Sequence, residues 1–310
     1  MVLAIVMLLG GAAILTVGAE SAVHGAGKLA RDRGISPFVL GALLFGVDVE
    51  SLGAAVVAAG QGRSSIAAGE AFGTIVFLLS AAFGAALLVS RKPIESPAPF
   101  MVLLPAGTLA IGAVVLADGF VSRPEGVVLM AAYGFYVNLV IREGRLARLA
   151  AARIEHEIEE EPRLRLPPLV RLLMGLALVY LGATVLVGGG IRVLDQTSLA
   201  AGFVGAAIIG ALAAADEVFL EVVPVRKGIP ELATGNLLGT IAAFSTGVLG
   251  LAAVVRPLVV DSAAASAFVA AAALYAIVAV VFLVRGRAWR VTGLVVLAAY
   301  AAWIVWASGI

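Results

Sequence analysis

The chain has 310 residues, of which 62% are hydrophobic and 13% are charged, and its formal net charge is +1. An ordinary soluble domain of this length does not carry so much apolar sequence, so the composition indicates a polytopic membrane protein. The chain contains no cysteine, which excludes disulfides and metal sites built from thiolates.

Ten apolar runs, separated by charged joints or by joints with proline and glycine, predict an all-α protein with ten transmembrane helices. At about 1.5 Å of rise per residue, runs of this length suit a hydrocarbon core about 30 Å thick. The predicted spans are 2–29, 36–60, 64–90, 98–118, 124–141, 169–192, 198–225, 229–255, 262–284 and 289–308.

The joints on one side of this topology are much more basic than those on the other. Cytoplasmic loops carry the excess of lysine and arginine, so both termini should face outward and the central loop should be cytoplasmic, in a prokaryotic plasma membrane. The basic side carries Lys28, Arg31, Arg33, Arg91, Lys92, Arg142, Arg145, Arg148, Arg153, Arg163, Arg165, Arg171, Arg226, Lys227, Arg285, Arg287 and Arg290. The other side carries Arg63, Arg123, Arg192 and Arg256.

The central loop, residues 142–168, divides the chain into halves of five spans each, residues 1–141 and 169–310. We expect the loop to be a solvated helix or linker, although its acidic run around His156 leaves a regulatory cation site open. Because five is odd, the second half would be inverted relative to the first. Similarity between the halves would then mark an inverted-topology repeat.

Short matches between the halves support such a repeat. They occur in the same order in both halves and bracket the acids of each half. Gly18–Gly25 resembles Gly182–Gly189 and Gly41 matches Gly205, both at an offset of 164, whereas Ala68–Thr74 resembles Thr234–Thr240 at an offset of 166.

The second half carries two adjacent acids inside an apolar run. Seventeen uncharged residues, 199–215, precede Asp216 and Glu217, and Arg226 marks the far end of the run. At about 1.5 Å per residue, Asp216 lies roughly 15 Å from that end, near the middle of the membrane. Ionised groups at this depth are expensive and need partners, protons or bound cations. The pair therefore predicts a cation site in the membrane.

The first half carries Asp48 and Glu50 at a matching depth of the span 36–60. Four carboxylates at one level suit a hard cation that prefers oxygen ligands. Calcium accepts irregular geometry, whereas magnesium demands a tight octahedron. We therefore predict a divalent-cation site formed by Asp48, Glu50, Asp216 and Glu217, with calcium as the preferred ion.

Two neighbouring spans offer flanking groups. Glu70 and Asn236 stand at the same place of the matched motifs Gly-Glu/Asn-x-x-Gly-Thr, and we expect them to coordinate or gate the ion. A glycine beside each of them would let another backbone come close. The accessory candidates are Glu221, Thr74 and Thr240. The alternative, in which the acids are paired or protonated and only lock helices together, stays open.

At these residues the chain resembles the cation/calcium antiporter superfamily, of the sodium/calcium exchanger type. The resemblance covers nearly the whole chain. Its clearest local matches are Gly25–Ser36 followed by Val39–Gly41, and Glu231–Thr240, which is similar to the family's Gly-Asn-x-x-Gly-Ser element.

The ion-binding helices of that family carry Gly-Thr-Ser-x-Pro-Glu, whose glutamate binds calcium and whose hydroxyls help to bind sodium. Read without gaps from Gly205, the second half keeps the glutamate as Glu217, with Asp216 in place of proline and alanines, Ala213 and Ala214, in place of the hydroxyls. These departures weaken the expectation of sodium coupling.

In the first half, the same reading from Gly41 gives Asp48–Gly53, in which the family's glutamate is missing. Glu50 stands three residues early, although the lengths of the repeats imply a slip of two residues here. Glu70 stands where the first repeat usually has asparagine.

The acids and the resemblance together imply a secondary antiporter that exchanges a divalent cation, calcium, for H⁺ or Na⁺ by alternating access. We expect no enzyme activity and no permanently bound cofactor, and the sequence has no phosphate-binding Gly-x-x-x-x-Gly-Lys loop. The expected partners are the lipid bilayer and inorganic cations, not nucleic acid. A cation channel, an exchanger homologue selective for another cation, and a sensor with an inactive site remain alternatives.

Overall fold

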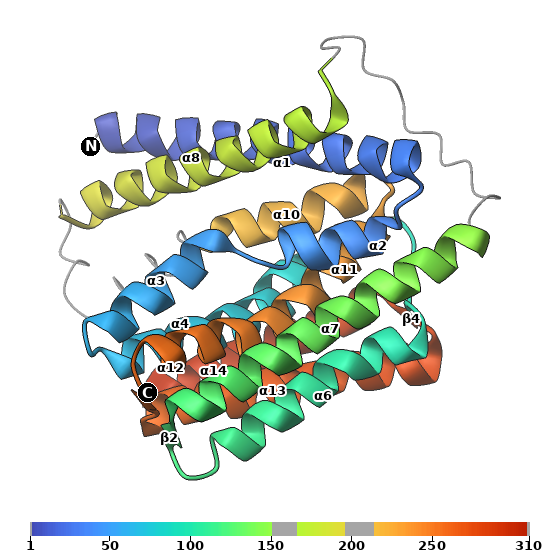
Figure 1. The fold of residues 1–310 in the computed structure, drawn as a ribbon. Coiled ribbons are helices and arrows are strands. Elements are labelled where there is room, and N and C mark those ends of the chain that lie inside the picture. Colours follow the sequence, from blue (N-terminus) through green and yellow to red (C-terminus); the bar gives the residue numbers. More distant parts are fainter. Residues whose placement is uncertain (1, 151–165, 196–213, 309–310) are drawn as a thin grey trace.

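The structure, a computed structural model, describes residues 2–150, 166–195 and 214–308, and of residues 49–50, 145–150, 194–195 and 306–308 the backbone alone. In this part the protein is almost entirely helical, as predicted, and most of its long helices run roughly parallel or antiparallel to one another (Figure 1). The first part of the predicted span 198–225 and the acidic run of the central loop lie outside the described residues.

The described elements of the first half follow the predicted spans closely. They are α1 (Val2–Arg33), α2 (Pro37–Leu40), the π-helix η1 (Gly41–Phe45), α3 (Val49–Gly60), α4 (Ser64–Phe77), the π-helix η2 (Leu78–Ala82), α5 (Phe83–Val89), β1 (Ile94–Glu95), α6 (Pro99–Val115), β2 (Phe120–Val121) and α7 (Arg123–Ala150). Two differences stand out. The span 36–60 is interrupted between η1 and α3, and α7 continues past the predicted end at residue 141.

The described elements of the second half have a similar order. They are α8 (Pro168–Asp195), α10 (Ala215–Arg226), α11 (Pro230–Ala242), the π-helix η4 (Ala243–Val248), α12 (Leu249–Val255), β3 (Leu258–Val259), α13 (Ser262–Arg285), β4 (Arg287–Ala288) and α14 (Arg290–Ser308). Within the described residues, six continuous helical stretches are long and apolar enough to cross a membrane, and three further helices are apolar but shorter.

Element bounds recur along the chain at a nearly constant spacing. The helices α10, α11 and α12 begin 166 residues after α3, α4 and α5, respectively. Gly62 and Gly228, which are also 166 residues apart, both have a φ of 78° in the turns that follow α3 and α10. L residues with a side chain rarely adopt this left-handed conformation, so glycine is required at both turns. The two stretches therefore repeat one local design.

The π-helices belong to this repeated design. Ser80 in η2 donates its hydroxyl to the carbonyl of Val76, and Thr246 in η4 donates to the carbonyl of Ala242. A hydroxyl that bonds the backbone one turn earlier perturbs regular helix geometry, and π-bulges interrupt helices in the same way. The two π-helices therefore occupy matching places in the long helices of the two halves.

Two short antiparallel ribbons tie the halves together. β1 pairs with β4 and β2 pairs with β3, so each ribbon joins a strand of the first half to a strand of the second. The strands lie in joints between helices, where backbone groups are not satisfied inside a helix and pair with one another instead.

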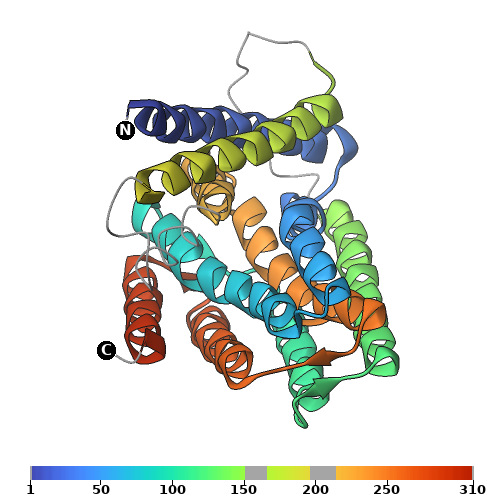
Figure 2. The same cartoon turned by 90° about the vertical axis from the view of Figure 1, so that its left-hand side faces the viewer.

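The helices α1 and α8 form a close pair along one side of the molecule (Figure 2). Glycines repeat every seven residues along both helices, and a Cβ atom added at any of them would collide with the partner backbone. At Gly175, for example, it would lie 2.2 Å from the amide nitrogen of Ala22. Small residues let membrane helices approach this closely. The glycines of this seam are Gly11, Gly18, Gly25, Gly175, Gly182 and Gly189.

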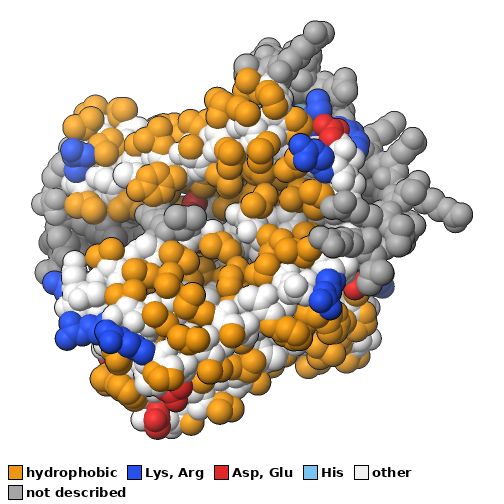
Figure 3. Space-filling view, in the orientation of Figure 1, with side chains coloured by type: hydrophobic (Ala, Val, Ile, Leu, Met, Phe, Trp, Pro, Cys, Tyr) orange, Lys and Arg blue, Asp and Glu red, His pale blue; other side chains and the backbone are white. Residues whose placement is uncertain are grey.

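The surface and the interior match a membrane environment. Apolar side chains cover the broad middle of the molecule, and Lys and Arg side chains gather toward its two ends (Figure 3). The helix α11 lies in the centre, where every residue from Leu232 to Ala242 is buried. Because lipid tails are apolar, an apolar outer belt needs no covering protein.

Candidate cation site

Two half-length helices begin in the middle of the bundle. Figure 1 places the first turns of α3 and α10 at a similar level along the long helices, and the two helices run in opposite directions from there. The first turn of a helix has free N–H groups and a partial positive charge, which stabilise a carboxylate. Asp48 accepts a hydrogen bond from the Ser51 amide at 3.2 Å, and Asp216 and Glu217 lie in the first turn of α10.

The acids of α10 meet the amide of Asn236 on α11. The Asn236 Nδ2 donates to Oε1 of Glu221 at 3.0 Å and contacts Oε2 of Glu217 at 3.5 Å. Glu217 is 3% exposed, and Glu221 and Asn236 are completely buried. A single neutral side chain thus holds two buried carboxylates in place.

Several buried oxygens in this described part of the structure lack a hydrogen-bond partner. Oε2 of Glu221, Oδ1 of Asn236 and the hydroxyl of Thr240 have no hydrogen-bond partner among the described residues. Buried polar atoms are normally paired, because burial without a partner costs free energy. Oxygens of this kind can accept a cation, a proton or a water molecule.

Close backbone contacts fix the position of Asn236. A Cβ atom at Gly235 would lie 2.1 Å from the carbonyl oxygen of Phe38, and one at Gly239 would lie 2.3 Å from that of Ala42. The expectation that the glycine beside Asn236 admits another backbone is therefore confirmed. For Gly69 the same expectation stays a prediction, because residues 204 and 208, which correspond to Phe38 and Ala42 at an offset of 166, lie outside the described residues.

The first half contributes a second polar group. The Ser51 side chain on α3 and Asp48 both lie close enough to the Glu70 carboxylate on α4 to act on it electrostatically. Asp48 also acts electrostatically on Glu217. Asp48 of the first half therefore lies within electrostatic range of an acid in each half.

The structure places the remaining predicted residues as follows. Asp216 lies beside Glu217, within electrostatic range. Thr74 donates its hydroxyl to the backbone carbonyl of Glu70 at 2.9 Å. The side chain of Glu50 is outside the described set, so its place in the predicted site stays a prediction. Among the described side chains, no three Asp, Glu or His groups are close enough together to hold a metal ion by themselves.

The sequence reasoning missed two features, namely the proximity of Ser51 to Glu70 and the hydrogen bond from Asn236 to Glu221. The ungapped reading from Gly41 uses an offset of 164, whereas the helix bounds give 166 from Val49 onward. That reading is therefore wrong by two residues at the acids. At an offset of 166, Ser51 corresponds to Glu217. The match between Ala68–Thr74 and Thr234–Thr240 already carried the correct offset.

The family model for sodium/calcium exchanger proteins matches residues 3–142 and 168–309. CaxA of Alkalimonas amylolytica, which is named as an antiporter, is 28% identical over 279 residues that cover 86% of this chain and 85% of CaxA. The inner membrane protein YrbG of Escherichia coli K12 is 27% identical over 283 residues that cover 86% of this chain and 84% of YrbG.

A solved structure of the sodium–calcium exchanger NCX_Mj has the same fold. The two structures superpose with a TM-score of 0.81 at 22% sequence identity, and the match covers 98% of each chain. Since the family model covers most of the sequence and the fold agrees over nearly all of it, this protein belongs to the sodium/calcium exchanger family of membrane cation antiporters.

Proposed function

We propose that this protein is a secondary active antiporter that exchanges a divalent cation, with calcium as the preferred ion, for H⁺ or Na⁺ by alternating access. The carboxylates of Asp48, Glu50, Asp216 and Glu217 form the central site. Glu70 and Asn236 coordinate or gate the ion beside it, and the accessory oxygens are those of Glu221, Thr74 and Thr240.

The observation that carries this proposal is the buried cluster of Glu217, Glu221 and Asn236 at the start of a half-length helix in the middle of the bundle. Two carboxylates buried at the middle of a membrane protein need positive charge nearby. Among the described residues, neither Glu217 nor Glu221 forms an ion pair with a basic side chain, so a transported cation or a proton can supply that charge.

The nature of the ligands favours a divalent ion such as calcium. Calcium takes 6–8 oxygen ligands at irregular positions, and the region offers carboxylate, amide and hydroxyl oxygens from several helices. The same oxygens would suit another hard divalent cation. The experiment below therefore also compares calcium with other divalent cations.

The proposed architecture is ten membrane-spanning helices arranged as two inverted five-helix repeats, residues 1–141 and 169–310, joined by the linker 142–168. The constant offset of 166 between helices of the two halves supports a repeat. The opposite directions of α3 and α10 in Figure 1 support the inversion, because equivalent helices of an inverted repeat run oppositely.

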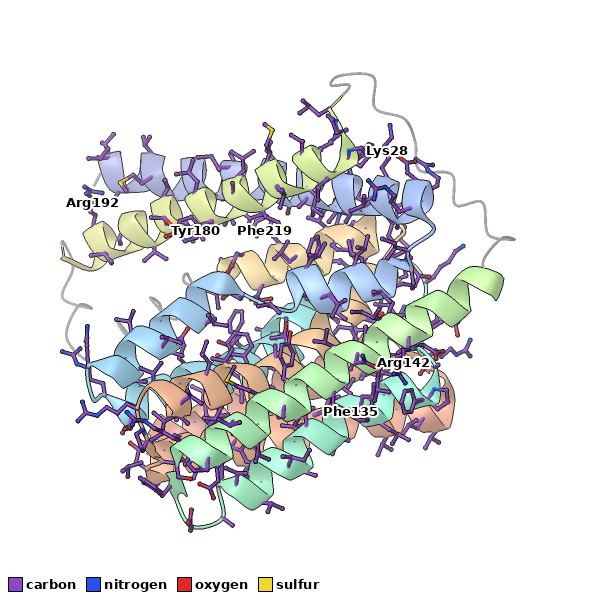
Figure 4. The ribbon with its side chains drawn as sticks, in the orientation of Figure 1. Lys28, Phe135, Arg142, Tyr180, Arg192 and Phe219 are labelled. Carbon is purple, nitrogen blue, oxygen red and sulfur yellow. The ribbon has the colours of Figure 1, made fainter. Side chains whose placement is uncertain are left out.

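The proposed orientation places the linker in the cytoplasm of a prokaryote and both termini outside. α1 begins and α14 ends at one end of the bundle, whereas the last turn of α7 and the first turn of α8 lie at the other (Figure 1). Figure 4 shows Lys28 and Arg142 at the linker end and Arg192 at the opposite end. The basic linker end would face the cytoplasm by the positive-inside rule.

The test is calcium flux in liposomes that contain the purified protein. An imposed Na⁺ or H⁺ gradient should drive calcium uptake against a calcium gradient, and Glu217→Gln should abolish this uptake. Competition by other divalent cations in the same assay measures selectivity. A channel would instead let calcium run down its own gradient whatever the counter-ion, and a sensor with an inactive site would give no flux; either result overturns the proposal.

A further inference from the structure

The offset of 166 makes two helix pairs equivalent, α3 with α4 in the first half and α10 with α11 in the second. Equivalent positions can therefore be read directly from residue numbers. Ser51 on α3 corresponds to Glu217 on α10, and Glu70 on α4 corresponds to Asn236 on α11.

The two residues of each pair lie on neighbouring helices and act on each other. In the second half, Asn236 reaches from α11 to the carboxylate of Glu217 on α10, with 3.5 Å between Nδ2 and Oε2. In the first half, the side chain of Ser51 on α3 lies close enough to the carboxylate of Glu70 on α4 to act on it electrostatically. Each half thus pairs one carboxylate with one neutral polar side chain at equivalent positions.

The two pairs carry their carboxylate on different helices. In the second half the carboxylate is on the first helix of the pair and the neutral group on the second, whereas in the first half the neutral group comes first. Because the two helices of each pair are neighbours and the paired positions face each other across them, moving the acid from one helix to the other would leave a negative charge nearby.

We propose that the carboxylate of the first half has changed helices, so that Glu70, oriented by Ser51, has the role at the ion that Glu217, oriented by Asn236, has in the other half. This inference rests on the proposed transport function. Glu70 and Glu217 are then equivalent ion-binding carboxylates, one from each half, beside the other acids of the proposed site. Ser51 is a positioning residue that acts through Glu70, and Asn236 orients Glu217 in addition to its proposed place beside the ion.

The surroundings support an equal role for the two acids. Asp48 lies within electrostatic range of both Glu70 and Glu217. The glycines at equivalent positions, Gly69 and Gly235, precede Glu70 and Asn236 on their helices.

The test exchanges the two residues of the first half. Glu70→Asn alone removes the carboxylate and should lower calcium exchange in liposomes by about tenfold or more, because a divalent ion loses a charged ligand at low dielectric. Combining it with Ser51→Glu recreates the arrangement of the second half and should restore exchange to within about threefold of the wild type, since charge and contact are both regained. Ser51→Glu alone is the matched control.

A second set of variants separates positioning from folding. Ser51→Ala should raise the KM for calcium and leave kcat nearly unchanged, since it loosens an ion ligand without removing it. Ser51→Thr keeps the hydroxyl and should restore the KM. If Ser51 were only structural, Ser51→Ala would lower the thermal stability and leave the KM unchanged, which would contradict its assignment.

The outcome that overturns the inference is a well-folded double variant that transports no better than Glu70→Asn. If that double variant does not fold, the mirror exchange, Glu217→Ser with Asn236→Glu, decides in the same way. Failure of the proposed function looks different, because the wild type itself would then show no exchange against a gradient. In that case the thermal stabilisation of the protein by calcium decides. The inference requires this stabilisation to be lost in Glu70→Asn and regained in the double variant. Any other pattern refutes the inference.

Discussion

At the residue scale, the most informative change is the removal of one charge and nothing else. Glu217→Gln keeps the shape of a buried side chain next to Asn236, and Glu50→Gln likewise removes only the charge of an acid of the first half. We expect each to reduce divalent transport by about tenfold or more while the protein still inserts, because solvent cannot replace a lost carboxylate at low dielectric. Initial rates of calcium flux check this.

The thermal stability and the transport rates of these two variants together show what a loss of transport means. Thermal stability in detergent should be close to that of the wild type for both, which excludes misfolding as the cause of lost transport. Wild-type rates in both variants would contradict the proposed central site. Wild-type rates in Glu50→Gln alone would assign the first-half contribution to Asp48 or Glu70 instead.

A second residue-scale prediction concerns a helix cap outside the membrane. Asp261 precedes α13 and accepts a hydrogen bond from the Ala264 amide at 2.8 Å, which holds the pKa of this carboxyl below its ordinary value of 3.8. A lowered pKa in the folded state means that the carboxylate stabilises the fold above the ordinary value. This stabilisation is lost as the pH falls through the lowered pKa.

Asp261→Ala should therefore lower the free energy of unfolding by about 1 kcal/mol at neutral pH, as the loss of a cap usually does. The difference in Tm between wild type and variant should shrink below the ordinary pKa of 3.8. Asp261→Asn is the control, because it can still cap but does not titrate. A difference that stays constant down to the lowest accessible pH would refute the charge-based account.

At the element scale, the α1–α8 pair offers a test of close packing. A Cβ atom at Gly175 would lie 2.2 Å from the amide nitrogen of Ala22, so Gly175→Ala must push the two helices apart. Overpacking of this kind costs about 1–3 kcal/mol, and we expect a clearly lower Tm. Gly10→Ala, in the same helix pair, is the control, because no described atom lies within 4 Å of a Cβ there. An equal Tm for both variants would mean that the seam is not close-packed.

The elements also show how far a single sequence could predict the fold. Helices that are continuous in the structure were predicted well, since a long apolar run has few alternatives in a membrane. The break between η1 and α3, and the π-helices, were not predicted. These depend on hydroxyls such as Ser80 and on contacts with other helices, and an apolar pattern records neither. The extension of α7 beyond residue 141 was missed because a solvated helix gives no apolar signal.

The candidate site was predictable for a different reason. Buried acids such as Glu217 are conspicuous in an apolar run, so their importance could be read from the sequence. The neutral partner was not conspicuous, because Ser51 looks like any small residue of a membrane helix. Its role became visible when the helix bounds fixed the offset between the halves at 166.

At the scale of the whole molecule, the orientation in the membrane can be tested with single cysteines, because the chain has none of its own. Arg142 and Arg192 are both exposed and lie at opposite ends of the bundle (Figure 4). In intact cells we expect Arg192→Cys to react with a membrane-impermeant thiol reagent and Arg142→Cys to react only after lysis, as the positive-inside rule requires. The reverse pattern would invert the proposed topology.

The coupling of the whole transport cycle is decided by what neutralises the buried acids when the divalent ion has left. A sodium ion needs several neutral oxygens, and the second half has Ala213 and Ala214 where the family has hydroxyls. A proton needs only one carboxylate oxygen, and Oε2 of Glu221 has no hydrogen-bond partner among the described residues. We therefore expect protons to be the counter-ion: divalent binding displaces them, and their return releases the ion. In liposomes, a pH gradient without sodium should drive calcium uptake, and a sodium gradient at constant pH should not. Uptake driven by sodium alone would refute this and would assign the coupling to hydroxyls such as those of Thr74 and Thr240.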